Sequence, residues 1–209
     1  MVEFRGALVT SEEEESVTRL LASQPESAGE LNELLERIKH RVAEAALHED
    51  AVRKRLARNR RRVLAVDWRD DKPNGEEPER RLAEVAIYDY DQDVLMIAVV
   101  DLHEGRVMEL FEREQVSPPI TADELAEARE VAGTASSWPE HDANIVAFPT
   151  PRYAFEPGSE RQRHRVCTLY GAAGEEDVYS IAVDLSAREV VPEHELPGIP
   201  RSSRDTSGF

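Results

Sequence analysis

The spacing of apolar residues predicts one long helix in the first third of the chain. Between residues 30 and 60, apolar side chains recur every three or four positions, and no glycine or proline interrupts them. This spacing places the apolar side chains on one stripe of an amphipathic helix. The stripe consists of Leu31, Leu34, Leu35, Ile38, Val42, Ala45, Ala46, Val52 and Leu56. Ser27 and Glu30 have the spacing of a capping box at the start of this helix.

After the predicted helix the hydrophobic period changes to two, which is typical of β-strands. The alternation predicts strands at residues 63–68, 82–90, 94–101 and 106–111. Short polar turns at residues 91–93 and 103–105 separate the last three of these strands. Turns of this length join neighbouring antiparallel strands, so we expect an antiparallel meander.

The second half of the chain repeats this order of elements. Pro118 and Pro119 stop the sheet, and Thr121 with Glu124 forms a capping box for a short helix that ends at Gly133. This helix carries Leu125, Ala128 and Val131 on its apolar face. Strands are then expected at residues 145–148, 165–170, 178–185 and 189–191.

An internal match supports a duplication. The segment AVVDLHEGRVM at 98–108 aligns with IAVDLSAREVV at 181–191, which places Asp101 on Asp184 at a separation of 83 residues. We therefore expect an α+β fold of two related units, each a helix packed on a four-stranded antiparallel sheet. The predicted organisation is an acidic flexible arm or short helix at 1–26, a first unit at 27–117, a second unit at 118–195 and a flexible tail at 196–209.

Four segments of the chain resemble the amino-terminal domains of copper amine oxidases. RLAEVAIYDYDQDVLMIAVVDLHEGRVMEL, followed by SPPITADELAEAREVA, is similar to the second domain of that family and to the start of the third. RHRVCTLY and VYSIAVDLSAREVV look like a more diverged copy of the third domain. The resemblance covers roughly residues 30–195 and implies two cystatin-like units. In the family, such domains flank the catalytic β-sandwich.

The catalytic signature of that family is missing from this sequence. The family's cofactor comes from a tyrosine that follows an asparagine, and none of Asn32, Asn59, Asn74 and Asn144 precedes a tyrosine. The family's copper is bound partly by a His-x-His pair, and no two of the six histidines have this spacing. The resemblance therefore implies no oxidase activity, no copper and no cofactor for this chain.

The charge and cysteine content narrow the classes of partner and the compartment. A net charge of −17 repels nucleic acid, so general DNA or RNA binding is disfavoured. No stretch approaches the ~18 consecutive apolar residues of a membrane-spanning helix. The first residues lack the pattern of a secretory signal, and the single cysteine, Cys167, allows no internal disulfide. These features favour a cytoplasmic protein.

One basic run departs from the acidic average. Residues 53–62 read RKRLARNRRR. The candidate partner-binding residues are Arg53, Lys54, Arg55, Arg58, Arg60, Arg61 and Arg62. In one interpretation they complement the negative end of the predicted helix and pair with the protein's own acids, for example Glu12–Glu15. In the other they bind an acidic protein, a phosphate-bearing ligand or RNA through bidentate arginine contacts.

The other conspicuous residues favour structural roles. The histidines are scattered, whereas a metal site needs three or four converging ligands. Asp101 and Asp184 each end a strand before a turn, where aspartate accepts backbone hydrogen bonds. Cys167 lies in an apolar strand, where a cysteine is usually a small buried hydrophobe. We therefore predict no catalytic, cofactor or metal site.

The sequence predicts a non-catalytic protein-interaction, scaffold or accessory module that binds a protein partner or a second copy of itself. Exposed strands or helix ends are the expected contact surfaces. Two alternatives remain open. One is a small-molecule-binding protein or atypical enzyme with a pocket between sheet and helix, and the other is binding of RNA or an acidic partner through residues 53–62.

Overall fold

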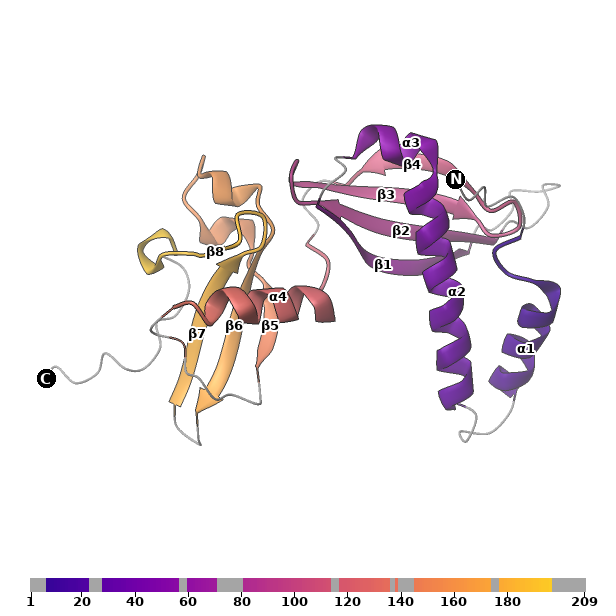
Figure 1. Ribbon diagram of the computed structural model, residues 1–209, viewed down its shortest axis with the longest axis horizontal. Coiled ribbons are helices and arrows are strands. Elements are labelled where there is room, and N and C mark those ends of the chain that lie inside the picture. Colours follow the sequence, from indigo (N-terminus) through magenta and orange to yellow (C-terminus); the bar gives the residue numbers. More distant parts are fainter. Residues whose placement is uncertain are drawn as a thin grey trace, which may run out of the picture. The chain divides into compact units, whose positions relative to one another are not determined.

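The computed structural model shows an α+β protein made of two compact units, residues 1–114 and 115–209 (Figure 1). The sequence places the boundary three residues later, between 117 and 118. The structure describes residues 7–22, 28–56, 60–70, 81–113, 117–135, 138, 145–173 and 177–196. None of the helices in these ranges is both long and apolar enough to cross a membrane.

In its described residues the first unit contains three α-helices and a four-stranded antiparallel sheet, sheet A, with the strand order β1-β2-β3-β4. The helices are α1 (Ser11–Ala22), α2 (Ala28–His48) and α3 (Asp50–Arg55). The strands are β1 (Arg61–Asp70), β2 (Arg81–Asp89), β3 (Val94–Asp101) and β4 (Arg106–Glu112). The predicted meander of the last three strands is confirmed, with bounds that differ from the prediction by at most one residue.

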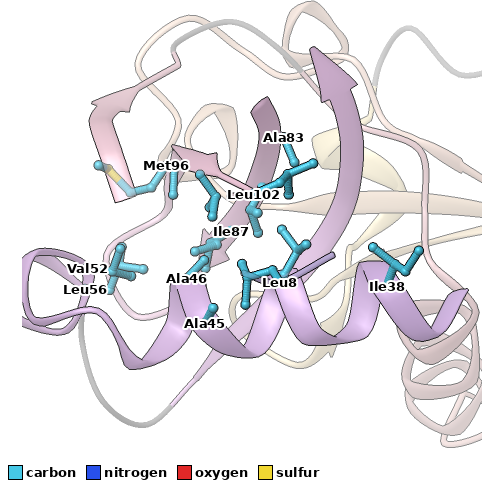
Figure 2. Packing of buried hydrophobic residues seen from close by; sticks show 14 of the residues in the cluster. Leu8, Ile38, Ala45, Ala46, Val52, Leu56, Ala83, Ile87, Met96 and Leu102 are labelled. Carbon is cyan, nitrogen blue, oxygen red and sulfur yellow. The ribbon is translucent and has the colours of Figure 1, made fainter. Parts of the chain in front are cut away.

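The core of the first unit lies between α2 and one face of sheet A (Figure 2). Alternate residues of β2 and β3 point to this face, because neighbouring side chains on a strand point to opposite sides. From β2 and β3 these are Ala83, Val85, Ile87, Met96, Ala98 and Val100. The buried stripe of α2 meets them with Leu34, Ile38, Val42, Ala45 and Ala46.

The prediction of a single long helix over residues 30–60 is wrong for the second half of this range. Glu49 has an extended backbone (φ −64°, ψ 132°) and separates α2 from α3, and the chain is extended again at Leu56. Val52 and Leu56 are nevertheless buried in the same core as α2. The break at Glu49 lets these two side chains reach the sheet. Helical periodicity alone does not reveal this requirement of tertiary packing. Ser27 of the predicted capping box lies outside the described residues.

The central strands β2 and β3 are buried on both faces. Charged side chains cross the face away from α2. Arg69 Nη1 on β1 lies 3.6 Å from Glu84 on β2 and 3.9 Å from Glu109 on β4. Val99 on β3 lies opposite Glu84 and Glu109 in the strand register. The ion pairs therefore extend over the Val99 side chain, which is 1% exposed.

Residues 11–22 form helix α1, one of the two outcomes left open for the acidic amino-terminal stretch. Glu13 of α1 accepts two hydrogen bonds of 2.8 Å from Arg41 of α2. Glu14 lies 2.5 Å from Arg81 of β2. The hydrogen bond from Arg41 is the main reason why the pKa of the Glu13 carboxyl lies below its usual value. These ion pairs attach the acidic helix to the first unit.

The described part of the second unit contains helix α4 (Ala122–Ala132) and sheet B with the strand order β5-β6-β7-β8. The strands are β5 (Val146–Pro149), β6 (Val166–Ala173), β7 (Asp177–Asp184) and β8 (Glu189–Val190). The predicted capping box of Thr121 and Glu124 is confirmed. Of the predicted apolar face of α4, Ala128 is buried, whereas Leu125 and Val131 are only half-buried. The other buried residues of α4 are Glu124 and Ala132. The predicted tail beyond residue 196 lies outside the described residues.

Both faces of sheet B are covered. Helix α4 packs against β6, β7 and β8 (Figure 1). One face of the sheet carries Cys167, Leu169 and Val183. Three single-turn 3₁₀ helices, η2 (Arg152–Ala154), η3 (Glu160–Gln162) and η4 (Glu193–Glu195), lie in the segments around β6 and after β8. Phe155, Val191 and Leu196, which flank these turns, pack on Val166 and Ala182 of the opposite face.

Candidate functional site

The basic run is divided between two elements. Arg53, Lys54 and Arg55 form the exposed last turn of α3, whereas Arg61 and Arg62 begin strand β1. Arg60 directly precedes β1, and Arg58 lies outside the described residues. The run therefore does not form one continuous helical face.

All five described arginines of the run contact residues of their own unit. Their contacts are Arg53 with Asp50 at 3.9 Å, Arg55 with Glu112 at 3.4 Å, Arg61 with the Leu47 carbonyl at 3.5 Å, and Arg60 and Arg62 with the Tyr90 ring at 5.4 and 5.7 Å. Within the described residues Lys54 has no ionic partner. The acids of α1 that form ion pairs contact Arg41 and Arg81, outside the run. The arginines of the run thus connect α3 with β4, and the start of β1 with α2 and Tyr90.

A buried ion pair fixes α4 to sheet B in the second unit. Arg165, just before β6, donates to both carboxylate oxygens of Glu124, with Nε–Oε1 at 2.8 Å and Nη2–Oε2 at 3.0 Å. The same guanidinium donates to the carbonyls of Pro118 and Pro119 at 2.9 and 3.0 Å. Glu124 is 0% exposed and also accepts the Thr121 backbone N–H of the capping box. One carboxylate therefore caps the helix and binds the strand.

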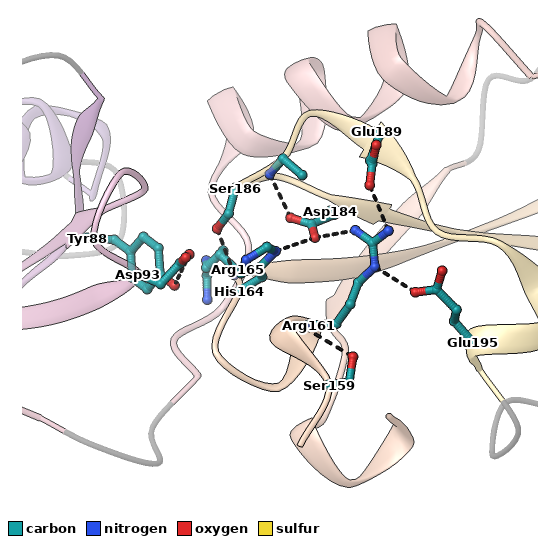
Figure 3. Close-up of polar contacts among 11 residues, drawn as sticks. Tyr88, Asp93, Ser159, Arg161, His164, Arg165, Asp184, Ser186, Glu189 and Glu195 are labelled. Atoms are coloured by element: carbon teal, nitrogen blue, oxygen red, sulfur yellow. Dashed lines mark hydrogen bonds and ion pairs between the residues drawn. The ribbon is translucent and has the colours of Figure 1, made fainter. Parts of the chain in front are cut away.

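A second ionic cluster surrounds Asp184 at the end of β7 (Figure 3). Its Oδ2 accepts from Arg161 Nη1 at 2.5 Å and lies 2.7 Å from His164 Nδ1, while its Oδ1 accepts the Ala187 backbone N–H at 2.8 Å. Arg161 also donates to Glu189 at 2.7 Å. The turn role predicted for Asp184 is confirmed. The sequence did not predict that two basic residues, Arg161 and His164, also contact this carboxylate.

Arg161 connects two 3₁₀ helices, η3 and η4, with strands of sheet B. It lies in η3, and its third carboxylate partner is Glu195 of η4, whose Oε2 is 2.9 Å from Nε. Burial lowers the pKa of Arg161, but the hydrogen bonds from Glu195, Glu189 and Asp184 outweigh this effect and raise the pKa. The guanidinium therefore stays charged and holds η3, β8 and η4 together.

Among the described residues of the second unit, Cys167 does not lie beside the ionic cluster of Asp184. Cys167 pairs with Val183 in the register, so its side chain points to the face opposite Asp184, which pairs with Val166. Burial and then the charge of Glu124 raise the pKa of the Cys167 thiol to about 12. The thiol is therefore protonated near neutral pH. Within the described residues no group of three His, Cys, Asp or Glu side chains could hold a metal ion.

The exposed large apolar side chains of both sheets lie on edge strands. Among the described strand residues these are Trp68 on β1, Met108 on β4, and Val146 and Phe148 on β5. Three of the four edges also carry charge, for example Arg69 on β1, Glu109 on β4 and Glu189 on β8. Charged side chains on an edge oppose pairing with another strand. The exception is β5, with the sequence VAFP.

Strand β5 presents apolar side chains and unpaired backbone groups together. Val146 and Phe148 are 52% and 56% exposed, and the Phe148 ring lies 5.9 Å from the Tyr170 ring on β6. The Thr150 N–H donates to the Val166 carbonyl. Backbone groups point alternately toward and away from the neighbouring strand, so the N–H groups of Val146 and Phe148 also point toward β6. The backbone groups of Ala147 therefore point away from the sheet. Within the described residues β5 pairs only with β6.

The proline in β5 fits this position at the edge. Pro149 follows the alternation of Ala147, so its nitrogen faces outward and the ladder with β6 loses no hydrogen bond. The sequence predicted a strand at 145–148 but not that the strand lies at an edge. The signal was present in the proline of the stretch IVAFPTP, because proline within a strand favours an edge position.

No protein-family model and no curated protein sequence matches this chain. The resemblance to the amino-terminal domains of copper amine oxidases therefore stays a prediction.

Proposed function

We propose that this protein is a binding module without chemistry of its own, and that it binds an extended segment of a protein on the β5 edge. The observation that carries the proposal is the contrast between β5 and the other edges. Strand β5 is uncharged and exposes Val146 and Phe148, whereas the other three edge strands carry charged residues. An open strand edge binds an extended chain through main-chain hydrogen bonds, and alternate side chains supply specificity.

The geometry of β5 supports docking of this kind. The N–H and C=O of Ala147 and the C=O of Pro149 point outward and are available to a new strand. Beside them, Val146, Phe148 and Tyr170 form an apolar strip for side chains of the incoming segment. Main-chain bonds would thus set the register, and burial of the strip would supply the apolar free energy.

Packing and charge elsewhere support a surface role rather than a chemical one. The space between α2 and sheet A is filled by apolar side chains, of which Ile38, Val42 and Ala46 are at most 2% exposed. Both oxygens of Asp184 are engaged by neighbouring donors. In this proposal the protein works in the cytoplasm, as an accessory or scaffold component.

We further propose that the two units are copies of one cystatin-like unit. Strands β3 and β7 begin at 94 and 177 and end at 101 and 184, a separation of 83 residues at both ends. Asp101 and Asp184 each accept a backbone N–H three residues ahead. The left-handed turn residues Gly105 (φ 65°) and Arg188 (φ 57°) have the same separation. These equivalences support the duplication seen in the sequence.

Binding of an extended peptide tests the proposal. We expect a capped, uncharged peptide of the sequence STVTVTS, added at millimolar concentration, to shift the backbone NMR signals of Val146, Ala147 and Phe148 in a saturable way. The reason is that the peptide completes the outward hydrogen bonds of β5. Phe148→Lys should abolish the shifts, because it places a charge on the apolar strip.

Met108→Lys is the matched control, since it makes the same chemical change on the edge strand β4. It should leave the peptide-induced shifts at β5 unchanged. Shifts spread evenly over all edges, or no shift at β5 at any peptide concentration, would refute docking on β5.

A further inference from the structure

We infer that the segment bound on the β5 edge belongs to a second copy of this chain, paired antiparallel about a two-fold axis at Ala147. This inference rests on the proposed function, because it names the partner of the same edge. It follows from the backbone, the side chains and the charge of β5, each of which is self-complementary.

The backbone of β5 can pair with a second copy of itself in an antiparallel register centred on Ala147. With Ala147 opposite Ala147 of the second copy, the two residues exchange both of their outward hydrogen bonds. The same register places Ile145 opposite Pro149, so the outward N–H of Ile145 meets the carbonyl of Pro149. Proline has no N–H to return, but its carbonyl accepts. A register centred one residue later forms fewer of these bonds. A register centred one residue earlier forms as many, but it gives up the direct pairing of Phe148 with Val146.

The side chains agree with this register. A two-fold axis at Ala147 places Val146 directly opposite Phe148 of the second copy, and Phe148 opposite Val146. Directly opposed aromatic and β-branched residues form favourable cross-strand pairs. The strip of Val146, Phe148 and Tyr170 in each copy would become one continuous apolar surface across the new strand pair.

The response to added salt distinguishes this interface from one formed by ion pairs. Two chains with a net charge of −17 repel each other, and salt screens this repulsion. Since β5 itself carries no charge, added salt should strengthen pairing through β5. Contacts between the exposed basic turn of α3 and the acidic surface of another copy would instead weaken as salt is added.

Sedimentation equilibrium on the full chain tests the inference. We expect the weight-average mass to rise from 23.6 kDa toward twice that value as the protein concentration increases. The short strand makes a small interface, so the dissociation constant should lie between about 1 µM and about 1 mM. It should decrease when NaCl is raised from low to physiological concentration and above.

Two variants assign the dimer to the β5 edge. Ala147→Pro removes an outward N–H only, and Pro149 shows that this strand accepts proline at an outward position. It should abolish the dimer and leave the far-UV circular dichroism and the melting temperature close to those of the wild type. Phe148→Lys should also abolish the dimer, whereas Met108→Lys, with the same change in net charge, should preserve it.

The outcomes separate this inference from the proposed function. A chain that stays monomeric at every concentration and salt level overturns the inference. The proposed function stands in that case if the STVTVTS peptide still shifts the signals of β5. A dimer that persists in Ala147→Pro, or one that weakens with added salt, also overturns the inference, because its interface then lies elsewhere. If neither dimer nor peptide binding is found, both proposals fall.

Discussion

Replacing Arg165 with methionine should destabilise the second unit by about 3–5 kcal/mol, the usual cost of removing one partner from a buried ion pair. The change takes the guanidinium away from the Glu124 carboxylate, which is 0% exposed, and from the carbonyls of Pro118 and Pro119. Water cannot replace these donors at a fully buried carboxylate without opening the joint between α4 and sheet B.

Urea unfolding followed by tryptophan fluorescence measures this effect. The chain has two tryptophans, and Trp138 lies in the second unit with its ring 4.9 Å from that of Tyr179. In a Trp68→Phe background, the fluorescence therefore reports on the second unit alone. The matched control is Glu127→Gln, which weakens the ion pair with the 60% exposed Arg188 and should cost less than about 1 kcal/mol.

A double variant checks the physical cause. Glu124→Leu combined with Arg165→Met removes both charges, so no ion stays buried without its counterion. The double variant should be less destabilised than the sum of the two single variants by more than about 1 kcal/mol. Strict additivity would show that the two side chains do not act as a pair.

Asp184→Asn should cost the second unit about 3 kcal/mol, because it removes the buried negative charge that Arg161 and His164 share. The amide oxygen of asparagine can still accept the turn N–H of Ala187, so the loss measures the ionic contacts. Without this carboxylate, the segments that Arg161 connects lose their link to the end of β7.

The first unit supplies the matched control for this change. Asp101 holds the equivalent turn and accepts the backbone N–H groups of His103 and Glu104 at 2.8 and 2.9 Å. Asp101→Asn keeps these bonds and should cost less than about 1 kcal/mol. Fluorescence of Trp68 in a Trp138→Phe background follows the first unit. Equal losses in the two units would show that the Asp184 cluster contributes nothing beyond its turn.

Much of the fold follows from local patterns. The strands β2 to β4 are predictable because period-two alternation coincides with short polar turns, and Gly105 provides a left-handed residue in one of them. Helix α4 is predictable because Thr121 and Glu124 satisfy each other at its start. In both cases the determinants lie within a few residues of one another.

Other features depend on tertiary contacts that a pattern does not contain. Residues 49–56 keep helical periodicity, but burial of Val52 and Leu56 is achieved with a break at Glu49. Glu124 lies on the buried face of α4 because Arg165, 41 residues later, supplies its counterion. The pairing of His164 with Asp184 likewise depends on the register of the β6–β7 hairpin.

Hydrogen exchange at the Ala147 amide tests the account most directly. This N–H points away from β6, as the Leu110 N–H does on the open edge of β4, so both should exchange rapidly in dilute protein. If β5 is the docking strand, exchange at Ala147 slows several-fold at high protein concentration or with saturating STVTVTS peptide, while Leu110 stays fast. Equally rapid exchange at both amides under all of these conditions would contradict docking on β5.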